Sequence, residues 1–239
     1  MNINEYDKLS PSEAIAYQHV IKNQIELKPL SKTINTIGGA DISFNKNEET
    51  VYAGIIVLSY PDLKVIDQVT VISKSTFPYI SGLLAFREIP ALMDAYNRLE
   101  NKPDLLILDG QGIAHRRRTG IASHFGVLIN SPTIGCGKSR LFGVFKEPEN
   151  QKFAESPLMD KNERLGTVLR SKINCNPLFI SPGNLITIEE STEIIKKCIL
   201  SYRIPEPTRL AHLLVNQARI AEMANQQQKF LFVVGSEPT

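Results

Sequence analysis

The sequence is poor in cysteine, and its few cysteines lie far apart. Cys136, Cys175 and Cys198 form no CxxC pair, which argues against a disulfide framework and against a zinc site. Residues 1–10 contain two acidic side chains and lack the apolar core of a signal peptide. No stretch approaches the roughly 18 apolar residues of a membrane span. The sequence therefore predicts a cytoplasmic protein in a reducing compartment, without membrane attachment.

The net charge is also small. The 239 residues carry a formal charge of +2, with 42% apolar and 22% charged residues, a composition typical of globular proteins. This balance excludes a highly basic nucleic-acid coat or an acidic tail, but it allows a local basic patch. A chain of this length buries about 70 to 75% of its unfolded surface on folding. We therefore predict one domain, residues 1–239, in which any bound metal serves function rather than folding.

The apolar pattern alternates between strand and helix periods. A capping box at Ser10 opens an amphipathic helix, and three strand-like runs follow as an antiparallel meander, at residues 36–44, 50–59 and 64–73. Leu105–Leu108 is wholly apolar, which is typical of a strand buried on both faces of a sheet. These elements predict an α/β fold, a mixed sheet with helices on both faces.

The remaining segments give weaker signals. Pro90 is expected to kink the helix at residues 81–99 or to begin a second one. Residues 145–164 are polar and are expected to form an exposed excursion. Other predicted elements are a short helix at 120–128, strands at 133–136, 167–172 and 177–180, a helix from the capping box at Thr187 to Tyr202, and a long helix after Pro205.

Two aspartates lie where strands would bring them together. Alternation places Asp41 on a small, polar strand face, and Asp109 ends the apolar strand, where open α/β sheets bind ligands. If these strands are neighbours, two carboxylates in one cleft need a cation or a raised pKa. Magnesium suits such a site, since it takes oxygen ligands and substrate phosphate. Phosphate-ester hydrolysis is the chemistry that this pattern favours. Glu88 would add a third carboxylate, or else it pairs with Arg87 or faces solvent.

Cationic and aromatic residues surround these carboxylates in the sequence. Lys138 follows a Gly-Cys-Gly turn, where an ammonium could neutralise phosphate charge. The side chains of the cationic cluster His115–Arg118 are predicted to contact phosphate beside Asp109, or else to lie in a solvated turn. His212, in the first turn of the last helix, could bind a metal or orient water. Tyr79 lies in a proline-stiffened loop that could stack on a base, or simply anchor to the core.

An ordered series of motifs between residues 38 and 212 closely resembles the endonuclease V family, deoxyinosine-directed nucleases with a ribonuclease H-like fold. The segments are GGADISF, FPYISGLLAFRE, LLILDGQGIAHRRRTGIASHFGV, TIGCGKS, SPGN, read as a turn, and YRIPEPTRLAH. A series in this order is more specific than any single motif. The resemblance implies a Mg²⁺-dependent enzyme, for which Mn²⁺ can substitute, that cuts the second phosphodiester bond 3′ to deoxyinosine and leaves 3′-hydroxyl and 5′-phosphate ends.

The resemblance also assigns roles to residues. It implies metal-binding carboxylates at Asp41, Asp109 and Glu88, a catalytic lysine at Lys138, and a metal-linked or water-orienting residue at His212. Tyr79 would be the wedge inserted at the lesion, and the glycine-rich segment would receive the flipped base. The substrate-binding residues on this reading are Tyr79, Gly82, Gly110, Gly112, His115, Arg117, Gly135 and Gly137.

Four positions depart from the family pattern. Ser81 and Arg116 stand where prolines are usual, Gly137 replaces an alanine, and Asn184 replaces a histidine. Proline would stiffen two of these loops. Any effect of the departures therefore falls on lesion selectivity rather than on hydrolysis.

Several alternatives stay open at this point. The substrate could be inosine in single-stranded RNA, the chain could bind inosine-containing nucleic acid without cutting it, or it could be a structure-specific junction nuclease of the same fold. The Tyr79 loop argues against the junction nuclease. We expect DNA containing deoxyinosine as the partner, and a monomer.

Overall fold

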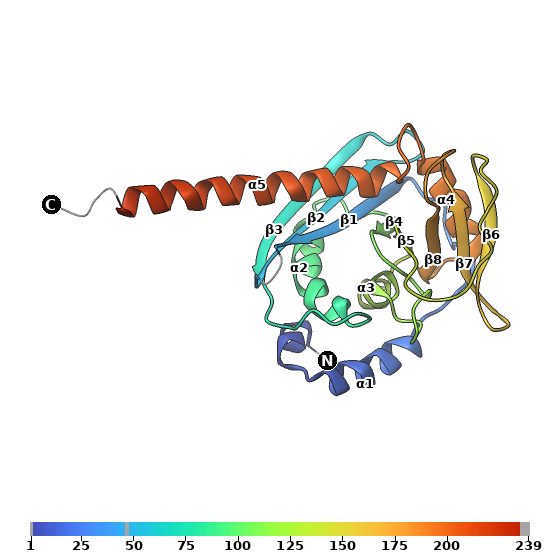
Figure 1. Cartoon of the computed structure of the whole chain (residues 1–239), viewed down its shortest axis with the longest axis horizontal. Coiled ribbons are helices and arrows are strands. Elements are labelled where there is room, and N and C mark those ends of the chain that lie inside the picture. The colour runs from blue at the N-terminus through green and yellow to red at the C-terminus, as the bar shows by residue number, and fades with distance from the viewer. Residues whose placement is uncertain (1, 46–47, 235–239) are drawn as a thin grey trace.

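The computed structural model describes residues 2–45 and 48–234, with side chains up to residue 224. The described strands form one mixed sheet in the order β3-β2-β1-β4-β5-β8-β7-β6 (Figure 1). The strands are β1 Thr36–Phe44, β2 Thr50–Ser59, β3 Val65–Lys74, β4 Leu105–Leu108, β5 Thr133–Gly137, β6 Ala154–Asp160, β7 Glu163–Arg170 and β8 Leu178–Asn184. The helices are the 3-10 helix η1 Ile3–Lys8, α1 Pro11–Lys22, α2 Leu84–Arg98, α3 Ile121–Ile129, α4 Ile188–Cys198 and α5 Glu206–Val234.

The predicted meander and the buried strand meet at the centre of the sheet. Strands β1, β2 and β3 pair antiparallel, and β4 pairs parallel with β1 on one side and β5 on the other. Ala40 is in register with Leu108. Asp41 follows Ala40 and Asp109 follows Leu108, so the two aspartates lie side by side where β4 ends, as the sequence predicted.

Strand β4 is buried on both faces, which confirms the interpretation of its apolar run. Leu106 and Leu108 pack into a core beneath α1, α2 and α3, whereas Leu105 and Ile107 pack into a second core beneath α4 and α5. Each fully buried side chain of this size contributes about 1.5–3 kcal/mol. The two cores place helices on both faces of the sheet (Figure 1).

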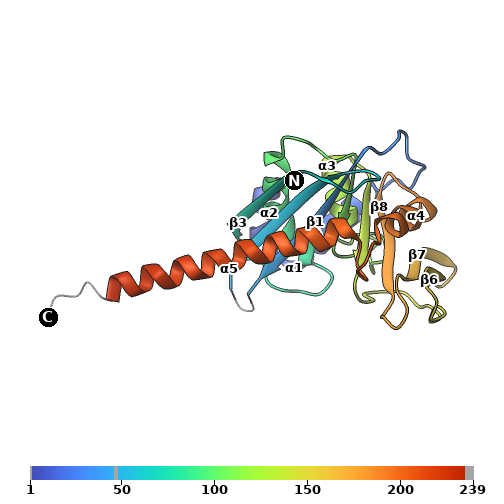
Figure 2. The ribbon, with the colours of Figure 1, turned by 90° about the horizontal axis from the view of Figure 1, so that it is seen from above.

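Helix α5 crosses the sheet and continues past its edge (Figure 2). Its first turn comes so close to β1 that a Cβ atom at Gly39 would lie 2.0 Å from the carbonyl oxygen of Pro207. A glycine is therefore required for α5 to lie against this strand. Despite the length of α5, none of the helices in residues 2–45 and 48–234 has the length and apolar character needed to cross a bilayer.

Three expectations about local structure are wrong, and a fourth is narrowed to one of its alternatives. The polar segment 145–164 contains β6, a strand at the sheet edge, where Pro157 and charged residues are tolerated. Of the two alternatives for Pro90, the structure excludes a second helix, since α2 runs through this residue. Residues 181–184 belong to β8 rather than to a turn. Helix α4 ends at Cys198, short of Tyr202.

Candidate active site

The three carboxylates predicted from the sequence line one small cavity. Asp41 comes from β1, Glu88 from α2, and Asp109 from the residue after β4. The cavity has a volume of about 40 Å³, and its other walls are apolar. The remaining lining residues are Ala40, Ile42, Leu92, Leu108 and Ile121. An apolar lining makes the charge on each carboxylate unfavourable unless a cation or a proton compensates it.

Burial and mutual repulsion raise the pKa values of two of these carboxylates. Burial raises the pKa of Glu88 to about 8, with further increases from the charges of Asp41 and then Asp109. The pKa of Asp41 is also raised, first by burial and then by Asp109, although a hydrogen bond from His212 and the charge of Lys138 act in the opposite direction. The cluster therefore has a strong affinity for positive charge.

His212 is held against Asp41 by a defined hydrogen-bond chain. Its Nδ1 lies 2.7 Å from Asp41 Oδ2, and its Nε2 lies 2.9 Å from Asn216 Nδ2. An amide nitrogen can only donate, so Nε2 accepts and the imidazole proton sits on Nδ1, directed at Asp41. Since α5 begins at Glu206, His212 lies in its second turn rather than in the first, one turn before Asn216.

Lys138 completes the charged cluster from the end of β5. Its Nζ forms an ion pair with Asp109 Oδ2. Its side chain is 39% exposed, whereas that of Asp109 is 17% exposed. The lysine side chain is thus more exposed to an incoming substrate than the carboxylate that holds it.

Among the described residues, no group of three His, Cys, Asp or Glu side chains converges closely enough to hold a metal ion. In this arrangement, Lys138 and His212 occupy oxygens of Asp109 and Asp41. The donor set nonetheless fits a hard cation, because three carboxylates share one cavity, and burial together with mutual repulsion raises two of the pKa values. A cation would take over the role of Lys138 on Asp109.

A second, larger pocket adjoins the carboxylate cavity. Its volume is about 390 Å³, and Glu88, Asp109 and Ile121 line both spaces. Lys138 lies in its wall, as do four of the predicted substrate-binding residues, Gly82, Gly110, His115 and Gly137. Gly112 and Gly135 are not in the lining. They pack against each other behind it, since a Cβ atom at Gly135 would lie 2.2 Å from Gly112 N.

The carbonyl of Gly82 is the most heavily bonded group of this pocket. It accepts from Gln18 Nε2 at 2.9 Å, His115 Nε2 at 3.0 Å and Arg117 NH2 at 3.0 Å. Gly82 has a φ of +81°, which favours glycine. Burial and then the charge of Arg117 lower the pKa of His115 to about 4. His115 is therefore neutral. Its Nε2–H donates to the carbonyl of Gly82, and its Nδ1 accepts from the amide of Arg117.

Sequence reasoning missed Gln18. It is fully buried on α1 between Ala14 and Ile21, which are apolar. A polar residue inside an apolar helical stripe is the signal that could have identified it, because such a side chain must find buried partners.

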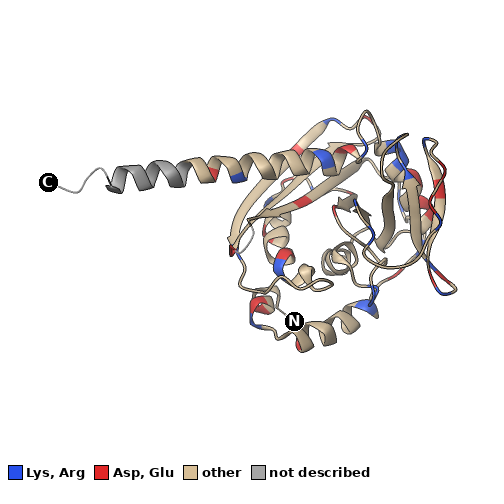
Figure 3. Ribbon diagram, in the orientation of Figure 1, with Lys and Arg blue, Asp and Glu red and all other residues tan. Residues whose placement is uncertain are grey.

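The three adjacent arginines have different environments. Arg117 donates to Gln18 and Gly82, and Arg118 is ion-paired with Asp160 and Glu163 at 2.6 Å each. Arg116 is exposed. Phosphate contact therefore stays a prediction, for which Arg116 is the most exposed of the three side chains. Figure 3 shows charges of both signs interspersed over the ribbon, in keeping with the small net charge.

Comparisons with known proteins point in one direction. A family model described as Endonuclease V matches residues 19–213. An Endonuclease V of Thermosipho melanesiensis is 47% identical over 205 residues, which cover 86% of this chain and 89% of that protein. The crystal structure of the Endonuclease V from Bacillus subtilis has a TM-score of 0.88 at 31% identity and covers 94% of this chain and 98% of that chain. The Ciona intestinalis Endonuclease V, in complex with a 23mer DNA containing an inosine followed by a ribo-adenosine, has a TM-score of 0.77 at 30% identity, with coverage of 88% and 98%.

Proposed function

Because the chain belongs to the endonuclease V family, we propose that it is a DNA repair endonuclease that recognises deoxyinosine and hydrolyses the second phosphodiester bond on its 3′ side. Its mixed sheet is the ribonuclease H-like fold of that family. The observation that carries the proposal is that two cavities of the protein share lining residues, among them Glu88 and Asp109. A cavity lined by three carboxylates adjoins a pocket of about 390 Å³, large enough for a nucleobase.

Nucleases of this family depend on a metal ion, and we propose Mg²⁺ here, with Mn²⁺ as a substitute. Asp41 and Asp109 would hold the ion, and Glu88 would hold the ion or its water. Such an ion supplies an activated water and neutralises negative charge on the scissile phosphate. The ligand set is three carboxylates, in keeping with the preference of Mg²⁺ for oxygen.

Two other side chains would position the groups that react and neutralise the charge that develops on the phosphate. His212 carries its proton on Nδ1 toward Asp41, and its Nε2 accepts from Asn216. It therefore keeps the Asp41 carboxylate oriented, and it would orient the attacking water indirectly, through that carboxylate. Lys138 would move from Asp109 to the phosphate and stabilise the charge that develops in the transition state. The oxygen of the water bonds to phosphorus as the water gives up one proton, and the bond from phosphorus to the 3′-oxygen breaks. The 3′-oxygen takes up one proton in exchange, which leaves 3′-hydroxyl and 5′-phosphate ends.

The flipped hypoxanthine would enter the larger pocket. Flipping requires a few kcal/mol, and less for a weakly paired base. Gly82, Gly110 and Gly137 leave room in the wall for main-chain groups to approach the base. Tyr79, 65% exposed at the tip of its loop, would enter the duplex as the wedge.

We also propose that the chain acts as one domain and as a monomer, in a reducing compartment such as the cytoplasm. The sheet that carries the site joins strands from residue 36 to residue 184, which supports the first point. Cys136, Cys175 and Cys198 are free thiols, which supports the last.

A parallel cleavage assay tests this proposal. Matched strands that carry deoxyinosine, riboinosine or deoxyadenosine at one position are incubated with the protein and Mg²⁺. We expect cutting of the deoxyinosine strand and none of the deoxyadenosine strand. Faster cutting of the riboinosine strand would instead indicate the RNA-directed activity, and tight binding without any cutting would indicate a binding module.

A further inference from the structure

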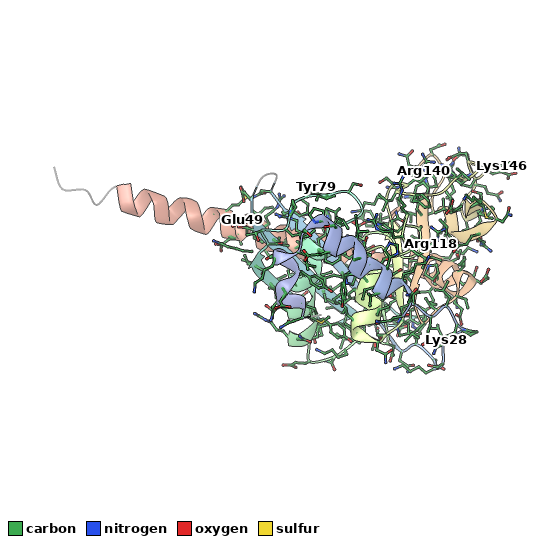
Figure 4. All side chains as sticks on the ribbon, turned by 90° about the horizontal axis from the view of Figure 1, so that it is seen from below. Lys28, Glu49, Tyr79, Arg118, Arg140 and Lys146 are labelled. Carbon is green, nitrogen blue, oxygen red and sulfur yellow. The ribbon has the colours of Figure 1, made fainter. Side chains whose placement is uncertain are left out.

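The loop that carries Tyr79 separates two pockets. The loop spans residues 75–83, between β3 and α2. Ser81 and Gly82 line the pocket beside the carboxylates, whereas residues 75–79 line a second cavity of about 630 Å³. The two lining sets share no residue. In Figure 4, Tyr79 lies at the edge of the molecule between Arg140, which lines the first pocket, and Glu49, which lines the second.

A buried arginine holds the walls of the second cavity together. Arg87, 8% exposed, donates from NH1 to the carbonyls of Ser75 at 3.1 Å and Phe77 at 2.8 Å, and from NH2 to the carbonyl of Glu48 at 2.5 Å. Its Nε has no hydrogen-bond partner among the described residues. The guanidinium of Arg87 thus joins the chain segment after β3 to the segment before β2. Arg87 is also the residue immediately before Glu88 in the sequence.

A second contact anchors the same wall. Asp7, in η1, accepts from Ser75 Oγ at 2.7 Å and from the amide of Phe77 at 3.1 Å. The cavity is therefore built from fixed backbone before any ligand enters, which lowers the entropy that binding must overcome.

The lining favours a flat, uncharged ligand with donors at its edge. The rings of Phe44 and Tyr79 have centroids 5.8 Å apart, and the guanidinium of Arg87 lies 5.3 Å from the centroid of Phe44. The carboxylates of Glu48 and Glu49 are exposed at the rim, where they would repel phosphate. A nucleobase meets these conditions, because its faces stack on aromatic rings and its edge carries N–H groups that carboxylates accept.

We propose that this cavity receives the base opposite the lesion once the Tyr79 loop has separated the pair. The proposal rests on the proposed function, since it presupposes a duplex opened at deoxyinosine. Opening one pair leaves two unpaired bases. One has its pocket beside the carboxylates, and the cavity on the other side of the same loop, with aromatic rings and acceptors, accommodates the second.

Equilibrium binding without metal tests the proposal. Three ligands share one deoxyinosine strand: a duplex with thymine opposite the lesion, a duplex with an abasic residue opposite, and the single strand alone. Phe44→Ala removes one ring from the cavity. We expect its loss of affinity for the thymine duplex to exceed its loss for the abasic duplex and for the single strand by about five-fold or more, the effect of one lost stacking contact.

Control variants separate this outcome from general damage. Tyr202→Ala removes an aromatic side chain that is 55% exposed between α4 and α5 and does not line the cavity, and it should weaken the three ligands equally or not at all. Phe44→Leu keeps the apolar volume and replaces Phe44→Ala if that variant does not fold. Equal losses on all three ligands would overturn the proposal, because Phe44 would then act on the loop alone.

The two hypotheses fail in different ways. If wild-type protein does not cut any deoxyinosine strand in the presence of metal, the proposed function fails. If it cuts them and the Phe44 variants show no selective loss on the thymine duplex, the function stands and the assignment of the cavity is wrong.

Discussion

His212 Nδ1 lies 2.7 Å from Asp41 Oδ2, although 171 positions separate the two residues in the chain. The contact exists because α5 lies directly on β1 at Gly39. A side chain from near the end of the described chain thereby reaches the carboxylate edge of a central strand. The site therefore depends on tertiary packing of α5, and its chemistry can be tested through the residue that orients His212.

Asn216→Leu should lower the cleavage rate without unfolding the protein. The substitution removes the donor on His212 Nε2, so the imidazole proton is no longer confined to Nδ1. We expect kcat to fall by about ten-fold or more, within the range of effects attributed to positioned acid–base groups, while KM changes little. The measurement is single-turnover cleavage, with Gln217→Leu, exposed on the same helix, as the control. An unchanged rate would show that the orientation of His212 is unimportant.

Gln18→Leu should impair discrimination between deoxyinosine and deoxyadenosine. The variant removes a donor to Gly82 O and the acceptor for Arg117 Nε, so groups in a buried site lose partners, at a cost of about 1–3 kcal/mol in stability. The ratio of kcat/KM for the two substrates reports the change. Gln18→Glu restores an acceptor for Arg117 but not the donor, and should remain impaired. Gln24→Leu, at an exposed position, should behave as wild type; an equal defect there would contradict the account.

His124→Gln should reduce the loss of stability in acid. His124 is fully buried and shares a 2.8 Å hydrogen bond with the Tyr6 hydroxyl, and burial lowers its pKa from 6.5 to about 3. The unfolded chain takes up the proton first, so stability is complete above pH 6.5 and falls as the pH drops toward 3. From pH 7 to pH 5 this residue should contribute a loss of about 2 kcal/mol.

Urea unfolding at pH 7 and pH 5 measures this contribution. His115, whose pKa is also lowered by burial, adds a loss in the same direction in both proteins, so the comparison isolates His124. His19→Gln, at an exposed position of α1, should keep the wild-type pH dependence. The prediction is wrong if His124→Gln shows the same loss between the two pH values as the wild type.

The sequence predicted those parts of the fold that depend on local patterns. The strand at residues 36–44, the apolar run of β4 and the capping boxes at Ser10 and Thr187 all appear in the structure where they were expected. The burial of β1 does not alternate, however, since residues 37–41 are all buried. Asp41 and Asp109 could be placed together because their side chains converge if the two strands are neighbours in the sheet, and β1 and β4 do pair parallel. Strand β6 was missed because an edge strand with polar residues carries little apolar periodicity.

The partners of Gln18 and Arg87 could not be predicted, for a different reason. Gln18 bonds to Gly82, 64 positions away, and Arg87 bonds to Glu48, 39 positions away. No local pattern encodes such pairs, since the fold alone brings the segments together. The pocket around Gly82 and the cavity beside Tyr79 therefore emerged from the structure.

Tyr79→Ala should slow cleavage at deoxyinosine in duplex DNA more than in single strands. Its side chain is 65% exposed, so its removal leaves the core intact, and only the opening of a base pair needs the wedge. The readout is the ratio of duplex to single-strand cleavage at deoxyinosine. Tyr79→Phe, which keeps the ring, should retain the wild-type ratio. An undiminished ratio in Tyr79→Ala would remove the wedge role.

The most direct measurement is the mapping of the cleavage site on a duplex that contains a single deoxyinosine. With Mg²⁺, the account predicts a cut at the second phosphodiester bond 3′ to the lesion, with 3′-hydroxyl and 5′-phosphate ends. It also predicts no cut after removal of divalent metal, or by Asp41→Asn and Asp109→Asn proteins. Cutting at another bond, cutting without metal, or cutting at the wild-type rate by either aspartate variant would contradict it.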